Sequence, residues 1–388
     1  MKKSLVIFLN QNFMTKSGWE GYQINKFSEY SDVIIYELAN LINPEHFNIV
    51  KNKKNSSLIK RFYSLKKWKE HFNVIINKKK YKKILIINSV KPKKIKSYLV
   101  LKELSKFNGP IVEYQTQYMP YGVKFKKNLN HYINIIINIK YFKRKIEEKV
   151  SNYLYKFISF KNYFYLVSGS AMIKKFKNEK NIIGGFHWDY NNTLTMKKSK
   201  VKKNKNYVVF LENMSPLFPG DAKMFPGLIN ISAEEFYPHL CKFFDKIESL
   251  FNTRVVIASH PKSRHKKNPS YFGYRKTFLN NTKNLIQGSR FVLAEPSTAL
   301  AYVIRYKKPC LMVFASKTLT SNYNKNEIYN ACKFTGMKPF NIENKFSKKQ
   351  MMKSLKVNFN NYKKFEKEYL YSVKNNVGNF NILKEKFL

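Results

Sequence analysis

Acidic residues are scarce in this chain of 388 residues, with 24 Asp and Glu against 73 Lys and Arg and a formal net charge of +49. Most of the basic residues are Lys, in a background rich in Asn, Ile, Tyr and Phe, so part of the excess reflects the codon usage of an AT-rich genome. The shortage of acids remains, and it predicts attraction to a polyanion such as a phospholipid surface or a charged glycan. Arg is sparse, and neither a zinc-ligand spacing nor an aromatic RNA-binding signature is present, which disfavours nucleic acid.

Cysteines and long apolar runs are also few. The three cysteines, Cys241, Cys310 and Cys332, show no paired spacing, which is typical of a reducing cytoplasm. No stretch of 18 apolar residues occurs, so we expect no transmembrane helix. The apolar run Leu5–Leu9 follows a basic start but is too short for the core of a signal peptide. It predicts a first buried strand instead.

The order of apolar runs predicts two α/β domains, which also suits the length. Strands are expected at Leu5–Leu9, Phe47–Val50, Lys83–Asn88, Pro110–Tyr114, Val167, Ile182–Phe186, Tyr207–Leu211, Arg254–Ala258, Arg290–Ala294 and Pro309–Phe314. Helices are expected at Asp32–Ile42, Lys94–Phe107, Ala233–Phe251, Lys283–Gly288 and Ser297–Tyr306. The basic run Thr195–Asn206 interrupts this alternation and reads as a linker.

The predicted fold is therefore α/β, with two Rossmann-like domains that face a cleft. We expect an N-terminal acceptor domain over residues 1–195 and a donor domain over residues 196–345. The helical, aromatic-rich segment 346–388 should cross back and brace the first domain.

Three polar loops follow strands of the second half, where open α/β sheets bind their ligands. They begin at Glu212, at Ser259-His260 and at Glu295. Free N–H groups and hydroxyls where a helix opens attract an anion, although Ser297 or Thr298 could equally be a helix cap. The predicted nucleotide-binding residues are His260, Pro261, Lys262, Arg264, Glu295, Ser297 and Thr298.

The pattern RVVIASHPKS, RFVLAEPSTALAYVI and KKPCLMVF resembles the second domain of bacterial GT-B sialyltransferases and related Kdo transferases. In that family a His-Pro motif and a Ser-Ser/Thr motif contact the CMP part of the donor. The resemblance implies that His260 stabilises the leaving phosphate and that Ser297 and Thr298 hold it. It covers Tyr207 to Phe314, and it implies a CMP-sugar co-substrate while leaving UDP- and GDP-sugars open.

The chain departs from the family in its catalytic base. No acidic pair followed by Gly is present, and the nearest approach is Glu20-Gly21. Other candidates for a base that deprotonates the acceptor hydroxyl are Glu113, Asp189 and Asp221. The four aspartates form no Asp-X-Asp pattern, so we expect no metal ion and no other cofactor.

The segment Lys124–Phe160 mixes basic and aromatic residues at helical spacing, as an interfacial helix does, although a core helix with a solvated face would also show this pattern. Lys140, Lys143, Arg144 and Lys145 are its candidate membrane contacts. We therefore expect a cytoplasmic enzyme on the inner face of the cytoplasmic membrane, with a glycan or lipid-linked acceptor. A nucleotide-sugar epimerase and a non-catalytic basic glycan- or membrane-binding protein are the alternatives.

Overall fold

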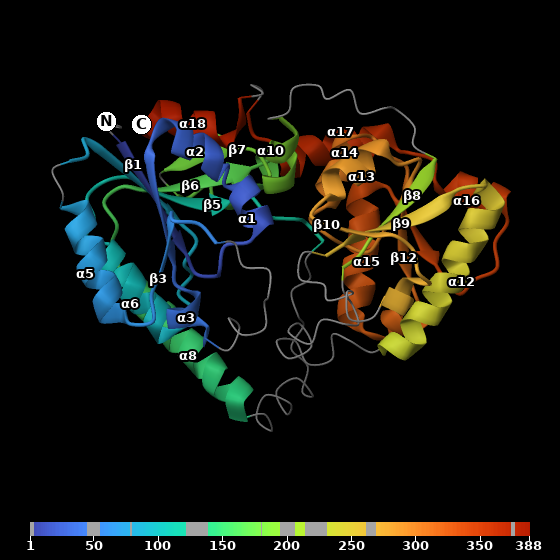
Figure 1. The fold of residues 1–388 in the computed structure, drawn as a ribbon, viewed down its shortest axis with the longest axis horizontal. Coiled ribbons are helices and arrows are strands. Elements are labelled where there is room, and N and C mark those ends of the chain that lie inside the picture. Colours follow the sequence, from blue (N-terminus) through green and yellow to red (C-terminus); the bar gives the residue numbers. More distant parts are fainter. Residues whose placement is uncertain are drawn as a thin grey trace.

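A computed structural model describes residues 4–44, 55–77, 80–121, 139–179, 181–194, 206–213, 231–260, 269–373 and 377–388. Its two parallel sheets lie side by side and are joined by helices from both halves (Figure 1). The first sheet has seven strands, in the order β3-β2-β1-β4-β5-β6-β7. They are β1 (Ser4–Asn10), β2 (Asp32–Glu37), β3 (Ile59–Arg61), β4 (Lys83–Asn88), β5 (Ile111–Gln115), β6 (Tyr163–Ser168) and β7 (Ile182–Gly185).

The second sheet has six strands, in the order β10-β9-β8-β11-β12-β13. They are β8 (Tyr207–Leu211), β9 (Arg254–Ser259), β10 (Thr277–Leu279), β11 (Val292–Ala294), β12 (Cys310–Phe314) and β13 (Lys338–Asn341). In both sheets the first strand lies between the second and the fourth, which is the strand order of a Rossmann fold. The two-domain α/β architecture expected from the sequence, of GT-B type, is confirmed.

Helices cover both faces of each sheet. Those of the first half are α1 (Lys16–Gly21), α2 (Ile24–Tyr30), α3 (Ala39–Ile42), α5 (Leu65–Ile76), α6 (Ile95–Leu104), α8 (Ile139–Tyr155), α9 (Ser170–Lys175) and α10 (Trp188–Leu194). Those of the second half are α12 (Ala233–Phe251), η2 (Pro269–Phe272), α13 (Thr282–Gly288), α14 (Leu300–Arg305), η3 (Ser316–Thr320) and α15 (Asn322–Thr335). The C-terminal segment holds α16 (Lys348–Ser354), α17 (Phe359–Phe365), the π-helical turn η4 (Glu366–Leu370) and α18 (Gly378–Phe387).

The central strands are apolar throughout because both of their faces are covered. In β1, Leu5 and Ile7 pack on the side of Trp68 and Val100, whereas Phe8 packs on the opposite side. This alternation follows from the two-residue period of a strand. Continuous apolar runs in the sequence therefore mark central strands such as β1, β4, β8 and β12 correctly.

One expected helix is wrong. The segment from Asp32 forms strand β2, paired with β1, and only its end forms the four-residue helix α3. The β-branched run Val33–Ile35 favours a strand, and burial against β1 outweighs the helical spacing of the apolar residues. The strand expected at Phe47–Val50 lies outside the described residues.

The C-terminal segment returns to the first sheet, as expected (Figure 1). Tyr371 forms an antiparallel bridge with Phe186 next to β7, and Ser372 N donates to Gly185 O at 2.9 Å. Gly169, at φ 77°, permits this close approach, since a Cβ there would lie 2.1 Å from Glu368 O. The return places the C-terminal segment across both sheets.

Helix α18 is then fixed by buried amide side chains. Asn379 Oδ1 accepts from Phe186 N at 2.8 Å, and Asn379 Nδ2 donates to Phe186 O at 2.9 Å. Asn379 N donates to Asn191 Oδ1, and Phe380 N donates to Gln23 Oε1, each at 2.9 Å. Side-chain oxygens thus accept from N–H groups of the first turn, which have no partner within the helix.

We predict that Asn379→Ala weakens this brace. The change removes two hydrogen bonds and leaves the N–H and C=O of Phe186 buried without partners. Unpaired buried groups cost about 1–3 kcal/mol each, so the free energy of unfolding in urea should fall by about 2–4 kcal/mol. Asn381→Ala is the control, because Asn381 makes one local bond, to Val377 O at 2.6 Å. Equal losses in the two variants would contradict the prediction.

Candidate functional site

The candidate site begins where the second sheet reverses its strand order, between β8 and β11. Leu211 pairs with Ala294, so the next residues, Glu212 and Glu295, leave neighbouring strands at the same edge. His260 follows β9, on the other side of β8. The first residues of the three loops predicted to hold the nucleotide therefore lie at one edge of the sheet, at the position where such folds bind ligands.

Two buried carboxyl groups form the floor of this edge. Glu212 Oε2 accepts from His260 N at 3.0 Å, and Glu295 Oε2 accepts from Asn213 N at 3.3 Å. Burial raises the pKa of Glu295 to about 8, with a contribution from the nearby charges of Glu212 and Glu327. Glu295 is therefore mostly protonated at neutral pH, which lets two carboxyl groups share a buried place.

Glu212 was not among the residues predicted from the sequence to act in the site. The hydrogen bond from His260 N to Glu212 fixes the backbone at His260, which is half-buried. The only signal in the sequence is its position directly after the apolar run Tyr207–Leu211. The bond itself depends on the register between β8 and β9. Pro261, Lys262, Arg264 and Asp221 lie outside the described residues.

The sequence predicts a helix that begins at Ser297, but α14 begins only at Leu300. Ser297 and Thr298 lie in the turn before it. The Ser297 Oγ accepts from Ala299 N at 3.3 Å, so this hydroxyl caps the turn. Because α14 has only six residues, its dipole adds little to anion binding. Any phosphate here would be held chiefly by hydroxyls and N–H groups of the turn.

The same turn contacts the first half of the chain along a seam, which we define by α10 on one side and α13 and α14 on the other. Asp189 of α10 accepts hydrogen bonds from Thr298 and Tyr302. Burial raises the pKa of Asp189 to about 6, although these two bonds favour the carboxylate. Tyr121 OH also donates to Ser297 O across the seam. Asp189, Ser297 and Thr298, all predicted site residues, are thus brought together.

Glu20 lies at the end of α1 and faces the same seam. Its charge raises the pKa of both Lys283 and Tyr302, although burial makes the net pKa of Lys283 lower than usual. Its carboxylate forms an ion pair with Lys16 at 4.0 Å, and the Glu20 side chain is 54% exposed. Gly21 sets its position, because a Cβ there would lie 1.7 Å from the ring of Trp188. No larger residue could bring α1 this close to α10.

Glu113, the remaining candidate base, lies inside a polar network of the first sheet. One oxygen contacts Lys91 Nζ and Gln115 Nε2, and the other accepts from Tyr163 OH at 2.6 Å. Both oxygens are therefore engaged within the first half. Of the described candidates, Glu20 and Asp189 are the carboxylates that face the second half. The described residues contain no group of three or more His, Cys, Asp or Glu side chains arranged to hold a metal ion.

No protein-family model matches the sequence, and no curated protein matches it either. Among solved structures, a UDP-GlcNAc 2-epimerase from Methanocaldococcus jannaschii is 12% identical, covering 98% of this chain and 99% of its own, with a TM-score of 0.49. A wall teichoic acid polymerase is 10% identical, over 100% and 90%, with a TM-score of 0.49. An alpha/beta-galactoside alpha-2,3-sialyltransferase from Photobacterium phosphoreum is 11% identical, over 88% and 99%, with a TM-score of 0.48. Such similarity assigns no reaction, so the function has to come from the residues of the site.

We predict that Glu295→Gln changes how stability depends on pH. Between its usual value of 4.5 and about 8, Glu295 keeps a proton in the folded protein that the unfolded chain has released. The folded state then binds more protons than the unfolded state, so the parent loses stability as the pH rises through this window. Gln does not titrate, and the free energy of unfolding of the variant relative to the parent should rise between about pH 5 and 8.

Urea unfolding at pH 5, 6.5, 8 and 9 measures this difference. Glu385→Gln, at an exposed position of α18, is the matched control and should show no such trend. A flat difference for Glu295→Gln would mean that this carboxyl is ionised in the folded protein across the whole range.

Proposed function

We propose that the chain is a metal-independent glycosyltransferase of GT-B type that uses a nucleotide-activated sugar. The donor sugar is best taken as a nonulosonic acid, such as sialic, pseudaminic or legionaminic acid, or as Kdo, carried by CMP. The acceptor is a bacterial surface glycan. One observation supports this most: the turn with Ser297 and Thr298 follows the carboxyl end of β11 and contacts the Asp189 carboxylate of the first half.

In this reaction the acceptor hydroxyl attacks the anomeric carbon of the donor. The bond from that carbon to the phosphate oxygen breaks, and CMP leaves with the electron pair. We assign the proton of the hydroxyl to Glu20, since Glu20 is exposed at the seam whereas the oxygens of Asp189 accept from Thr298 and Tyr302. His260, held through its backbone by Glu212, would donate to the departing phosphate.

Asp189 has a separate role in this proposal. A donor phosphate bound by Thr298 would meet the Asp189 carboxylate at close range, and two anions there repel each other. Protonation of Asp189, whose pKa is about 6, or release of Thr298 removes this conflict. Donor binding is thereby linked to the contact between the two halves.

We predict that His260→Ala and Glu20→Gln each lower the turnover number at least a hundredfold while leaving the thermal midpoint close to that of the parent. Removing one donor to a developing anion costs about a hundred- to a thousandfold, and removing a general base a similar amount. The matched controls are His239→Ala and Glu29→Gln, both at exposed positions, which should keep the parent rate. Transfer is assayed with CMP-, UDP- and GDP-sugars in excess EDTA.

Three results would count against the proposal. Complete loss of activity in EDTA with recovery in Mn²⁺ would exclude a metal-independent reaction. Epimerisation of UDP-GlcNAc without an acceptor would favour the epimerase. A nucleotide at a hundred times its dissociation constant should raise the free energy of unfolding by about 2.7 kcal/mol. A protein that shows no reaction and no thermal shift with CMP, UDP or GDP would instead be a non-catalytic binding protein.

We further propose that the enzyme docks on an anionic membrane through α8, at the cytoplasmic face. Along this helix the large apolar residues Phe142, Ile146, Val150 and Tyr153 are each 43–60% exposed, at spacings of three or four residues. Such a stripe covers one side of a helix. Lys143 is exposed beside it, and Lys145 bonds to Glu148 at 2.8 Å. Among the described helices none is long and apolar enough to cross a membrane.

We predict that binding to phosphatidylglycerol vesicles is strong at low salt and weakens steeply towards 0.15 M, where screening acts over about 8 Å. Each basic residue near such a surface contributes about 1 kcal/mol. Binding should therefore fall at least tenfold when four residues are changed to Gln, namely Lys140, Lys143, Arg144 and Lys145. Transfer to a soluble acceptor should stay near the parent rate.

The control removes four exposed lysines of the second half, Lys325, Lys333, Lys349 and Lys353. It changes the net charge equally but leaves α8 intact. Equal loss in both quadruple variants would show that net charge alone drives binding. A separate variant, Phe142→Ser with Ile146→Ser, should weaken binding at high salt as well, because it removes the apolar contribution.

A further inference from the structure

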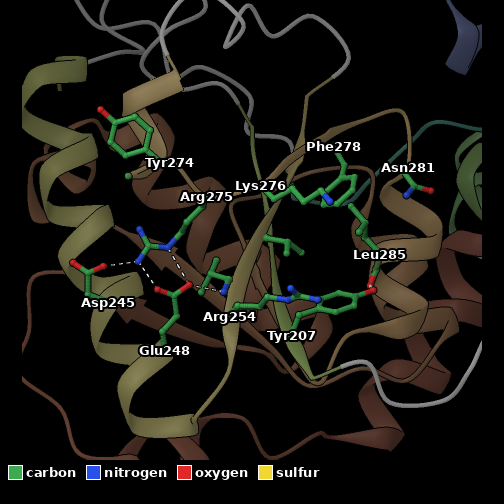
Figure 2. Close-up of a pocket in the computed structure, with 13 residues that line it drawn as sticks. Tyr207, Asp245, Glu248, Arg254, Tyr274, Arg275, Lys276, Phe278, Asn281 and Leu285 are labelled. Atoms are coloured by element: carbon green, nitrogen blue, oxygen red, sulfur yellow. Dashed lines mark hydrogen bonds and ion pairs between the residues drawn. The ribbon is translucent and has the colours of Figure 1, made fainter.

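A hollow of about 630 Å³ lies at the opposite end of the second sheet from Glu212 and Glu295 (Figure 2). Arg254 begins β9 and Lys276 directly precedes β10, so the hollow opens at the amino ends of these strands. Its remaining walls come from α12, β8 and α13, including Tyr207 and Asn281. Nothing in the proposed reaction uses these residues.

One wall of the hollow contains an ion-pair network centred on Arg275. Arg275 bonds to Asp245 and, through Nη2, to Glu248 Oε2 at 2.6 Å. Arg275 Nε also donates to Glu248 Oε1 at 3.2 Å, and that oxygen accepts from Val255 N at 2.7 Å. Figure 2 shows this group on the side of α12. Asp245 and Glu248 carry two negative charges against one positive charge on Arg275, so this wall has a net charge of −1, and the whole lining, with Arg254 and Lys276, has a net charge of +1.

Two further cations line the hollow without a direct ion-pair partner among the described residues. Within the described residues, no carboxylate forms an ion pair with the exposed side chains of Arg254 and Lys276. Figure 2 shows Arg254 extending towards Tyr207, and Lys276 lying towards Phe278 on the opposite side. The Lys276 ammonium lies 5.4 Å from the centre of the Phe278 ring. The hollow therefore presents two positive groups, of which Lys276 lies beside an aromatic ring.

A further aromatic residue, Tyr274, lines the hollow and has an unfavourable backbone conformation. Tyr274 is 84% exposed and adopts φ 63°, a left-handed conformation that is unfavourable for a bulky side chain. Gly273 before it has φ 56°, and a Cβ at that glycine would lie 2.9 Å from Arg275 Nη1. An exposed ring gains little from packing within the chain, and an external ligand that contacts the ring would offset the cost of this conformation.

We propose that this hollow is an accessory binding site for a negatively charged saccharide unit, with Arg254 and Lys276 pairing with its carboxylate or phosphate and Tyr274 contacting its ring. A guanidinium binds such anions through paired hydrogen bonds, and an ammonium binds them as a point charge. Aromatic faces offer a large apolar contact at low entropic cost, which suits the apolar face of a sugar ring. A purely apolar ligand would leave the two cations desolvated.

Helix α13 lies between the hollow and the seam. The link from the hollow to the acceptor rests on the proposed function. Lys283 Nζ donates across the seam to Asn192 O at 3.3 Å, and its pKa responds to Glu20. Asn281 and Leu285, two residues to either side of Lys283, line the hollow. A single helix, about 10 Å wide, thus separates the two places. A long acidic acceptor could reach from the seam past α13 into the hollow.

The test measures binding without any donor. The probes are a tetramer of sialic acid, a tetramer of galacturonic acid and the neutral maltotetraose, titrated by calorimetry at low and at physiological salt. The parent should bind both acidic tetramers at least tenfold more tightly than the neutral one. Arg254→Gln with Lys276→Gln should lose that preference, whereas Lys325→Gln with Lys353→Gln, of equal charge change, should keep it.

A third variant separates binding from stability. Tyr274→Gly removes the ring and supplies a residue that accepts a left-handed conformation. It should weaken saccharide binding severalfold while leaving the urea midpoint unchanged or higher. A variant with unchanged binding would remove Tyr274 from the site.

The outcomes distinguish this inference from the proposed function. Equal affinity for acidic and neutral tetramers, or equal loss in both double variants, would overturn the accessory site even if sugar transfer is observed. Conversely, selective binding that depends on Arg254 and Lys276 would support the site even in a protein that transfers no sugar. If the enzyme is active, the double variant Arg254→Gln with Lys276→Gln should have a lower kcat/KM for long acidic acceptors. Its kcat/KM for a monosaccharide acceptor should be unchanged.

Discussion

The return of the chain along β7 is the constraint on which the rest of the structure depends. Each sheet could form from its own segment, since every strand pairs within its half. The bridge of Tyr371 to Phe186 and the buried Asn379 attach the C-terminal segment to the first half. The aromatic residues before them, among them Tyr362 and Phe365, belong to a core that also contains residues of both halves. This segment, together with the direct contacts of α10 with α13 and α14, brings the candidate residues Glu20, Asp189 and Thr298 to one seam.

Much of the fold follows from continuous apolar runs, because parallel strands covered on both faces need no polar alternation. Edge strands are harder to predict: β10 and β13 have three and four residues and are partly exposed, so they show no such run. The segment that forms β2 misleads for another reason. Its apolar residues satisfy a helical and an extended period together, and only pairing with β1 selects the strand.

The site could be predicted where it depends on strand ends and not where it depends on pairing. His260, Glu295 and Thr298 follow apolar runs, so their shared edge can be inferred from the order of elements. The bond from His260 N to Glu212 requires the register between two strands. The bond between Thr298 and Asp189 joins residues from different halves, and no local pattern in the sequence specifies that distance.

Two carboxyl groups have raised pKa values in spite of the net charge of +49. A uniform positive field would lower carboxyl pKa values, yet salt screens it over about 10 Å, whereas burial acts locally. Burial therefore prevails at Glu295 and Asp189, whose pKa values rise to about 8 and about 6. Both groups lie at the candidate site, Glu295 at the switch point of the second sheet and Asp189 at the seam, so their protonation depends on local burial more than on the net charge of the chain.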